Sequence, residues 1–275
     1  MRFVKNRGVW HVTQLPEVES SLVSMDPQTG AILALVGGFD FYRNKFNHVT
    51  QAQRQPGSIF KPFIYSAALE KGLNAATLVN DGYLYITAAE LNSSENWEPQ
   101  NYNEKFSGPV RLREGLAKSK NLVAIRVLKH IGPKYAQDYV SRFGFDPKKH
   151  QPYLSMALGV GEVTAMEMVS AYSVFANGGY LKKPYFIEKI IDSKGRKVKL
   201  SSALMNAEVP RIIDPRNAFI MTDMLKEVIN TGTARKAKRL QRSDIAGKTG
   251  TTNNLIDAWF AGYNPDIVTV TWMGF

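Results

Sequence analysis

Three segments of strand composition follow one another late in the sequence, and they restrict the fold more than any other feature. They cover residues 244–251, 258–263 and 267–273, and short polar turns join them. Their β-branched and aromatic residues favour strands, and the short connections predict antiparallel pairing. A further segment of strand composition covers residues 185–191. We therefore expect an antiparallel sheet.

The rest of the sequence predicts one more hairpin and a layer of helices. The apolar runs 22–25 and 31–36 flank the turn sequence Asp26-Pro27-Gln28-Thr29-Gly30, which is typical of a β-hairpin. Residues 74–109 are polar and without clear period, so they predict a long ordered loop region with short elements. Apolar spacing and end signals predict helices over 59–71, 135–143, 163–177 and 215–231, and two helices within 110–131 that meet at a break near Ser119 and Asn121.

The composition is that of a globular chain with a sizeable core. Of the 275 residues, 44% are apolar, and the formal charge of +11 favours an anionic partner without choosing its class. Cysteine is absent, which excludes disulfides and cysteine nucleophiles, and the scattered histidines have no metal-ligand spacing. We expect no metal and no cofactor. The sequence has no signal-peptide core and no stretch of roughly 20 apolar residues, so it is expected to be soluble or cut from a longer tethered protein.

A serine and a lysine three residues apart form the first candidate for chemistry. In Ser58-Ile59-Phe60-Lys61 the two side chains share one face of a helix, and Pro62 places the start of that helix close to Ser58. A helix N-terminus stabilises negative charge beside an attacked carbonyl. A neutral lysine accepts the proton of a serine nucleophile when burial or a second cation lowers its pKa. On its own, the pattern is far more often that of a serine that caps a helix beside a solvated lysine.

Two further motifs strengthen the catalytic interpretation. Ser119-Lys120-Asn121 falls at the predicted helix break, and Lys248-Thr249-Gly250 lies in a strand-like run before Thr251. The order Ser-x-x-Lys, Ser-x-Asn, Lys-Thr-Gly is the signature of penicillin-binding proteins and class A β-lactamases, with Lys120 in place of the middle Asp of the β-lactamase form. Ser94-Glu95-Asn96 also fits Ser-x-Asn, but it lies in an unpatterned polar loop.

The residue types of these motifs suit acyl transfer on a peptide with a free carboxylate. Lys248 supplies a cation for that carboxylate, Gly250 lets a substrate backbone approach, and the Asn121 amide orients the peptide. An extended substrate can add as a strand along residues 248–252 and gain main-chain hydrogen bonds.

Beyond these motifs, the sequence over 22–275 resembles the class A penicillin-binding proteins. The resemblance is carried by the stretches Asp26–Gly38, Arg54–Ser58, Trp97–Tyr102, Gly108–Arg113 and Asp257–Tyr263. Gly38-Phe39-Asp40-Phe41 is similar to the Gram-negative type 1a branch.

The resemblance implies a role for each motif residue. Ser58 would attack the D-Ala-D-Ala bond of a donor stem peptide, with Lys61 as the base and Ser119 as a proton relay. Asn121 would contact the substrate amide. The backbone N–H groups of Ser58 and Thr251 would form the oxyanion hole. The carboxylate site would consist of Lys248, Thr249 and Thr251, and Gly250 would be a further substrate-binding residue.

The resemblance also implies a fold, a domain plan and a location. The fold expected is of the serine β-lactamase/transpeptidase type, an α/β (α+β) fold with an antiparallel sheet flanked by helices and a helical subdomain at roughly 74–180. Residues 1–19 would be a linker or the remnant of a preceding domain, and 20–275 a transpeptidase domain truncated at its C-terminal end. The full-length protein would carry a membrane helix and a glycosyltransferase domain at the periplasmic face of the inner membrane.

The partners implied are peptidoglycan stem peptides, β-lactams as covalent inhibitors, and regulators of cell-wall synthesis. A D,D-carboxypeptidase differs only in its acyl acceptor and remains an alternative. A β-lactamase needs a base that directs water, for which Glu98, Glu104 and Glu162 are candidates by location only, and a non-catalytic β-lactam sensor is a further alternative. The basic stretch 235–242 has no interleaved aromatic residues, so nucleic-acid binding is not expected.

Overall fold

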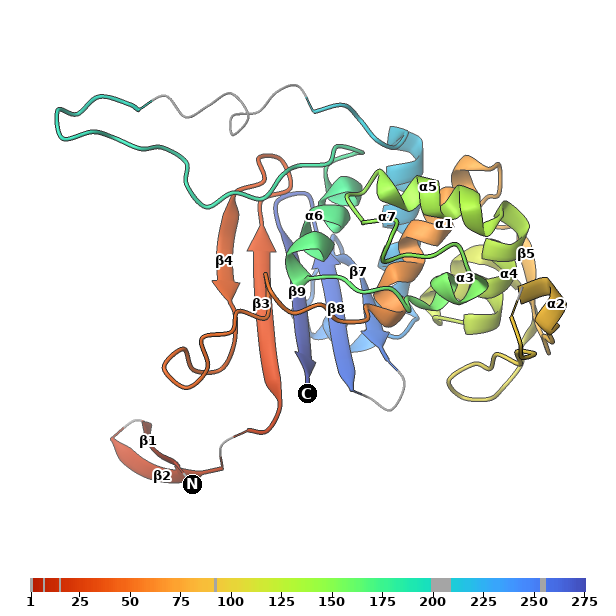
Figure 1. Cartoon of the computed structure of the whole chain (residues 1–275), viewed down its shortest axis with the longest axis horizontal. Helices are drawn as coiled ribbons and strands as arrows, with labels where there is room; N and C mark the ends of the chain where they lie inside the picture. The colour runs from red at the N-terminus through yellow and green to blue at the C-terminus, as the bar shows by residue number, and fades with distance from the viewer. Residues whose placement is uncertain (1, 7, 15, 92, 199–208, 253–255) are drawn as a thin grey trace.

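A five-stranded antiparallel sheet lies at the centre of the protein (Figure 1). The computed structural model describes residues 2–6, 8–14, 16–91, 93–198, 209–252 and 256–275. The sheet has the strand order β4-β3-β9-β8-β7. Its strands are β3 (Glu19–Met25), β4 (Ile32–Val36), β7 (Ala246–Thr251), β8 (Asp257–Tyr263) and β9 (Val268–Gly274). The predicted hairpin and the antiparallel pairing of the last three strands are therefore confirmed.

One predicted strand is wrong. Residues 185–191 form no strand, and only isolated bridges join Tyr185 to Ala31 and Ile191 to Lys197. Phe186 and Ile187 are both more than 60% exposed. Strand composition alone does not make a strand, because the measured preference reflects packing against neighbours on a pleated surface.

Helices cover the sheet and continue into a helical region beside it. The helix α6 (Ala165–Ala176) packs on β3, β8 and β9, and α7 (Pro215–Asn230) packs on β7 and α6. Thr164 and Glu167 form a capping box for α6, and Asp214 caps α7 as its sequence predicts. The 3₁₀ helix η3 (Arg235–Leu240) carries the exposed basic stretch. No helix among the described residues is both long and apolar enough to cross a membrane.

The helical region lies beyond α1 (Lys61–Glu70) (Figure 1). It contains the predicted break between α3 (Leu112–Ala117) and α4 (Asn121–Ile131), and a loop region with short elements as expected. Its other elements are β5 (Leu78–Asp81), α2 (Ala88–Leu91), β6 (Gly108–Arg111), α5 (Pro133–Ser141) and η2 (Leu154–Leu158). A separate hairpin of β1 (Arg2–Asn6) and β2 (Val9–Thr13) lies away from the sheet.

The helix α1 is buried on all its faces. Every residue from Lys61 to Ala68 is buried, because the sequence there is apolar in every direction rather than along one stripe. Phe63 packs against Phe143, Tyr172 and Phe175 with ring centroids 5.0–5.5 Å apart. The start of this helix is therefore held by the core of the molecule.

Candidate active site

The turn that carries Ser58 lies between the strand β7 and Gly159. Ser58 lies in the 3₁₀ helix η1 (Gly57–Phe60), and α1 follows from Lys61, so the regular helix begins three residues later than Ser58. Gly57 has φ +55°, and a Cβ there would lie 2.8 Å from the Thr251 carbonyl oxygen. The Gly57 N–H donates to the Gly159 carbonyl at 3.2 Å. The turn therefore has no room for a larger residue at Gly57.

The amine of Lys61 is fully buried among neutral oxygen acceptors. It donates to the Ser119 carbonyl and to Asn121 Oδ1, both at 2.7 Å, and lies 3.4 Å from Ser119 Oγ. Burial, and then repulsion from the Lys248 cation, hold the pKa of Lys61 well below its ordinary value. A neutral amine has two N–H groups and one lone pair. With both N–H groups given to these acceptors, the lone pair is left to take a proton.

Lys248 is the second fully buried amine, and it meets Lys61 at one hydroxyl. Its Nζ lies 2.8 Å from Ser119 Oγ and 3.0 Å from the Thr249 carbonyl. Burial lowers the pKa of Lys248 to about 7. Ser119 itself has φ +56°, a left-handed conformation that is uncommon outside glycine. That conformation lets both its carbonyl and its hydroxyl face the lysines.

Gly250 lets β7 approach the turn that carries the serine. A Cβ at Gly250 would lie 2.7 Å from the Pro56 carbonyl oxygen and 2.9 Å from Ile59 Cγ2. The sequence interpretation assigned this glycine to close approach of a substrate, whereas the structure shows close approach of the protein's own backbone. The backbone of Thr251 lies beside Gly57, which brings the two predicted oxyanion donors, the N–H groups of Ser58 and Thr251, to neighbouring segments.

Thr233 is a neighbour of the site that sequence reasoning missed. Its Oγ1 lies 2.5 Å from Thr249 Oγ1, and its N–H donates to the Ala117 carbonyl at 3.1 Å. A Cβ on the preceding Gly232 would lie 2.1 Å from that same carbonyl. The sequence predicts only that a helix ends at Thr231. No spacing in the sequence links residues 231–233 to residues 248–250.

The competing candidates lie outside this cluster. Asn96 accepts the N–H of Ala88 at 2.8 Å from an exposed loop, so Ser94-Glu95-Asn96 serves α2. Glu98, Glu104 and Glu162 are all exposed, and Glu98 is hydrogen-bonded to Tyr83. Across the described parts of the chain, no group of three or more His, Asp or Glu side chains is placed to hold a metal ion.

Comparisons with known proteins agree with this arrangement. A family model described as the penicillin-binding protein transpeptidase domain matches residues 20–273. Penicillin-binding protein 1A of Neisseria lactamica is 51% identical over 276 residues, which is 100% of this chain and 34% of the relative. Penicillin-binding protein 1A of Pseudomonas aeruginosa is 42% identical over 98% of this chain and 38% of that relative. The chain thus spans about a third of the length of these curated relatives.

Solved structures give the same result. The crystal structure of penicillin-binding protein 1A from Haemophilus influenzae matches with a TM-score of 0.93 and 36% identity, over 99% of this chain and 46% of that one. PonA1 of Mycobacterium tuberculosis in complex with penicillin V matches with a TM-score of 0.77 and 25% identity, over 95% of this chain and 70% of that one. The predicted fold class is therefore confirmed, and the chain belongs to the penicillin-binding protein transpeptidase family, among class A relatives named penicillin-binding protein 1A.

Proposed function

We propose that this chain is a D,D-transpeptidase domain that cross-links peptidoglycan stem peptides through an acyl-enzyme on Ser58. The observation that carries the proposal is the pair of buried lysines, Lys61 and Lys248, that meet at the hydroxyl of Ser119 beside the Ser58 turn. A buried lysine without a contacting carboxylate is a candidate base, since burial disfavours its charged form.

We assign the steps of the reaction to these residues. Ser58 Oγ attacks the carbonyl carbon between the two D-Ala residues, and its proton passes to the Lys61 lone pair. Backbone N–H groups of Ser58 and Thr251 stabilise the oxyanion. The C–N bond then breaks, and the proton held by Lys61 passes through the Ser119 hydroxyl to the leaving D-Ala amine, which makes Lys61 neutral again. An acceptor amine attacks the ester carbonyl carbon and loses its proton to Lys61. The ester C–O bond breaks, the Ser58 oxygen takes that proton from Lys61, and the cross-linked peptide is released.

The substrate carboxylate and amide have their own partners in this proposal. Lys248 and the hydroxyls of Thr249 and Thr251 bind the carboxylate of the terminal D-Ala, and Gly250 keeps that strand close to Ser58. Asn121 contacts the substrate amide through its side chain. We propose further that residues 20–275 form this domain and that it works at the periplasmic face of the inner membrane, with β-lactams as covalent inhibitors. Regulators of cell-wall synthesis are proposed as further partners.

The proposal is tested by intact-mass spectrometry after addition of a penicillin to the parent chain and to Ser58→Ala. A long-lived adduct of one penicillin on the parent, absent from Ser58→Ala, supports the assignment. Rapid release of hydrolysed drug would indicate a β-lactamase instead. No adduct on a parent chain that shows a folded near-UV circular dichroism spectrum would overturn the nucleophile assignment. Dimeric rather than shortened products from stem peptides separate transpeptidation from carboxypeptidation.

The acylation rate is expected to have a bell-shaped pH profile. Lys61 must be neutral to act as base, and its pKa is lowered, so acylation is lost as pH falls through that lowered value. Lys248 must be charged to bind a carboxylate, so the second-order rate constant falls again as pH rises through about 7 in the free protein. Lys248→Arg keeps a permanent cation and is expected to remove the alkaline limb alone. A profile whose only limb lies near lysine's ordinary pKa would contradict both roles.

Thr233→Val is expected to weaken binding of the ligand carboxylate without changing the limiting acylation rate. The substitution removes the hydroxyl 2.5 Å from Thr249 Oγ1. Loss of one hydrogen bond of about 1 kcal/mol corresponds to roughly a 5-fold weaker apparent affinity. Saturation kinetics with a chromogenic penicillin measure it. Thr231→Val is the matched control, because that hydroxyl bonds Glu227 instead. Equal behaviour of the two variants would remove Thr233 from the carboxylate site.

A further inference from the structure

A buried ion pair involves Lys120, the residue between Ser119 and Asn121. Lys120 Nζ lies 2.8 Å from Asp81 Oδ2, with side chains that are 9% and 0% exposed. Burial opposes the charge of Asp81, but hydrogen bonds from Asn101 and Lys120 outweigh it and keep its pKa below the ordinary value. A buried ion pair contributes little net stability, because desolvation offsets the attraction between its charges. What the pair does is fix the positions of Lys120 and Asp81 relative to each other.

The carboxylate of Asp81 connects this pair to the backbone of Asn121. Asp81 Oδ1 accepts a hydrogen bond from Asn101 Nδ2 at 2.7 Å, and Oδ2 accepts one from the Ser107 N–H at 3.0 Å. Asn101 is buried, and its Oδ1 accepts the N–H of Asn121 at 2.9 Å. The Asn121 side chain in turn donates from Nδ2 to the Gln100 carbonyl at 2.9 Å. The loop therefore holds both the backbone and the side chain of Asn121.

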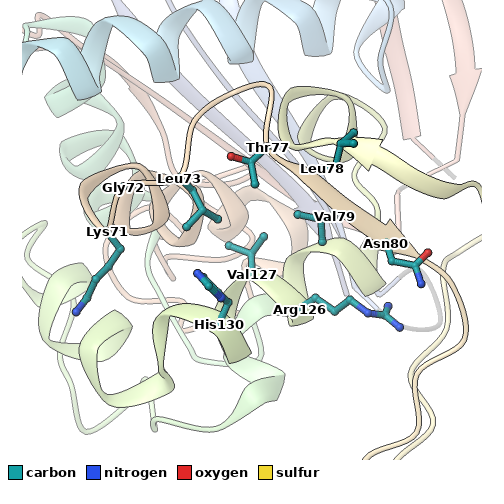
Figure 2. Close-up of a pocket in the computed structure, with 10 residues that line it drawn as sticks. All are labelled: Lys71, Gly72, Leu73, Thr77, Leu78, Val79, Asn80, Arg126, Val127 and His130. Carbon is teal, nitrogen blue, oxygen red and sulfur yellow. The ribbon is translucent and has the colours of Figure 1, made fainter.

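The helix α4 also fixes the backbone that follows Asp81. The guanidinium of Arg126 donates to the Gly82 carbonyl at 2.9 Å and to the Tyr83 carbonyl at 2.7 Å. Figure 2 shows Arg126 on α4 near Asn80 at the end of β5. Both residues line a cavity of about 560 Å³. None of the residues lining this cavity belongs to the candidate active site. The segment 81–83 is thus held at two places. Lys120, just before α4, pairs with Asp81, and Arg126 within α4 bonds the carbonyls of Gly82 and Tyr83.

We propose that Asp81, Lys120 and Asn101 are positioning residues for acylation. They hold the turn so that the Ser119 carbonyl and Asn121 Oδ1 both occupy the N–H groups of Lys61, each at 2.7 Å, which leaves the lone pair for the Ser58 proton. When the turn is no longer held in place, the Lys61 amine adopts other orientations. In fewer of these orientations does its lone pair face the Ser58 proton. The inference rests on the proposed function, because it concerns the acylation of Ser58.

The first test compares Lys120→Met with a matched control in the full chain. Asn217→Ala is the control, since Asn217 belongs to another buried polar cluster, whose hydrogen bonds join it to Ser66 and Tyr139 and not to Ser58, Lys61, Ser119, Asn121 or Lys248. Both variants lose buried hydrogen bonds and are expected to unfold at lower temperature. Only Lys120→Met is expected to slow acylation by a fluorescent penicillin, by about 10- to 100-fold, because small misplacements of reacting groups have effects of this size. Asn217→Ala is expected to stay within about 2-fold of the parent.

The second test is a double-mutant cycle between Asn101→Ala and Asn121→Ala. Asn101 accepts the backbone N–H of Asn121, so its loss moves both the Asn121 side chain and the neighbouring Ser119 carbonyl. Once the Asn121 side chain is gone, only the part of the effect that passes through Ser119 remains. We expect Asn101→Ala to slow acylation about 10-fold in the parent and by a smaller factor, about 3-fold, in the Asn121→Ala background. A purely structural role would lower the unfolding temperature by similar amounts in both backgrounds. Asn101→Ala would then slow acylation by the same factor in both, so the two effects on the activation free energy would be additive.

The outcomes separate this inference from the proposed function. An adduct on the parent that is absent from Ser58→Ala establishes the nucleophile independently of Lys120. On that chain, slow acylation of Lys120→Met together with a non-additive cycle supports the positioning role. An acylation rate of Lys120→Met equal to that of Asn217→Ala, or an additive cycle, overturns it while the proposed function stands. A parent chain that is folded and not acylated overturns both.

Discussion

Lys61→Met is expected to reduce the rate of acylation by about 100- to 10,000-fold, the range that a general base contributes. Methionine has a similar length and no proton-accepting amine, and α1 is buried on all sides, so an apolar side chain fits the position. The substitution removes the desolvation cost of a buried amine, but it leaves the Ser119 carbonyl and Asn121 Oδ1 without the donor that each has at 2.7 Å. We therefore expect a folded variant whose unfolding temperature is lower than that of the parent.

The measurement pairs the acylation rate with thermal unfolding. Stopped-flow or intact-mass kinetics with a penicillin give the rate, and circular dichroism gives the unfolding temperature. Loss of acylation in a variant that is still folded at the assay temperature assigns Lys61 to the chemistry. A rate within about 10-fold of the parent would assign the base to another group, and Lys248 would then be the next amine to test.

Gly250→Ala is expected to lower acylation about 100-fold or more, by moving β7 away from the Ser58 turn. The added Cβ meets the Pro56 carbonyl oxygen at 2.7 Å, a distance at which the backbone has to shift. A displacement of about 1 Å between reacting groups has an effect of that order.

A glycine elsewhere supplies the control for this prediction. Gly72→Ala introduces a Cβ with nothing within 4 Å, at φ +95°. It is expected to reduce stability by about 1 kcal/mol, because alanine disfavours that conformation, and to leave acylation unchanged. Acylation rates of the two variants are compared, and crystal structures show whether β7 has moved away from the Ser58 turn in Gly250→Ala. If Gly250→Ala acylates at the rate of Gly72→Ala, β7 has more freedom to adjust than this packing indicates.

The cluster around Lys61 was predictable because its members belong to short motifs with their own chemistry. Ser58 and Lys61 are three residues apart, and the order of the motifs pointed to Ser119, Asn121 and Lys248 before any coordinates. The family was predictable from the same residues, together with the longer stretches around them. The roles of the individual residues stay predictions until they are measured.

The parts that were not predictable depend on contacts between distant segments. Thr233 reaches Thr249 only because α7 returns the chain to the edge of β7. Asp81 lies in a region whose polar sequence indicated only an ordered loop. Its partner Lys120 stood out in the sequence only as the residue in place of the middle Asp of the β-lactamase motif. For residues 185–191 the sequence predicted too much. Their composition favours a strand, but only isolated bridges pair with them.

The sheet order also bears on how the domain folds. The strand β3 pairs with β9, with Glu19 opposite Gly274, so two segments far apart in the sequence become neighbours. Closing such a long loop is slow, because entropy is lost before the distant contacts form. The hairpin of β3 and β4 therefore keeps one hydrogen-bonding edge open until β9 reaches it. During folding this open edge is the segment on which a chaperone has most reason to act.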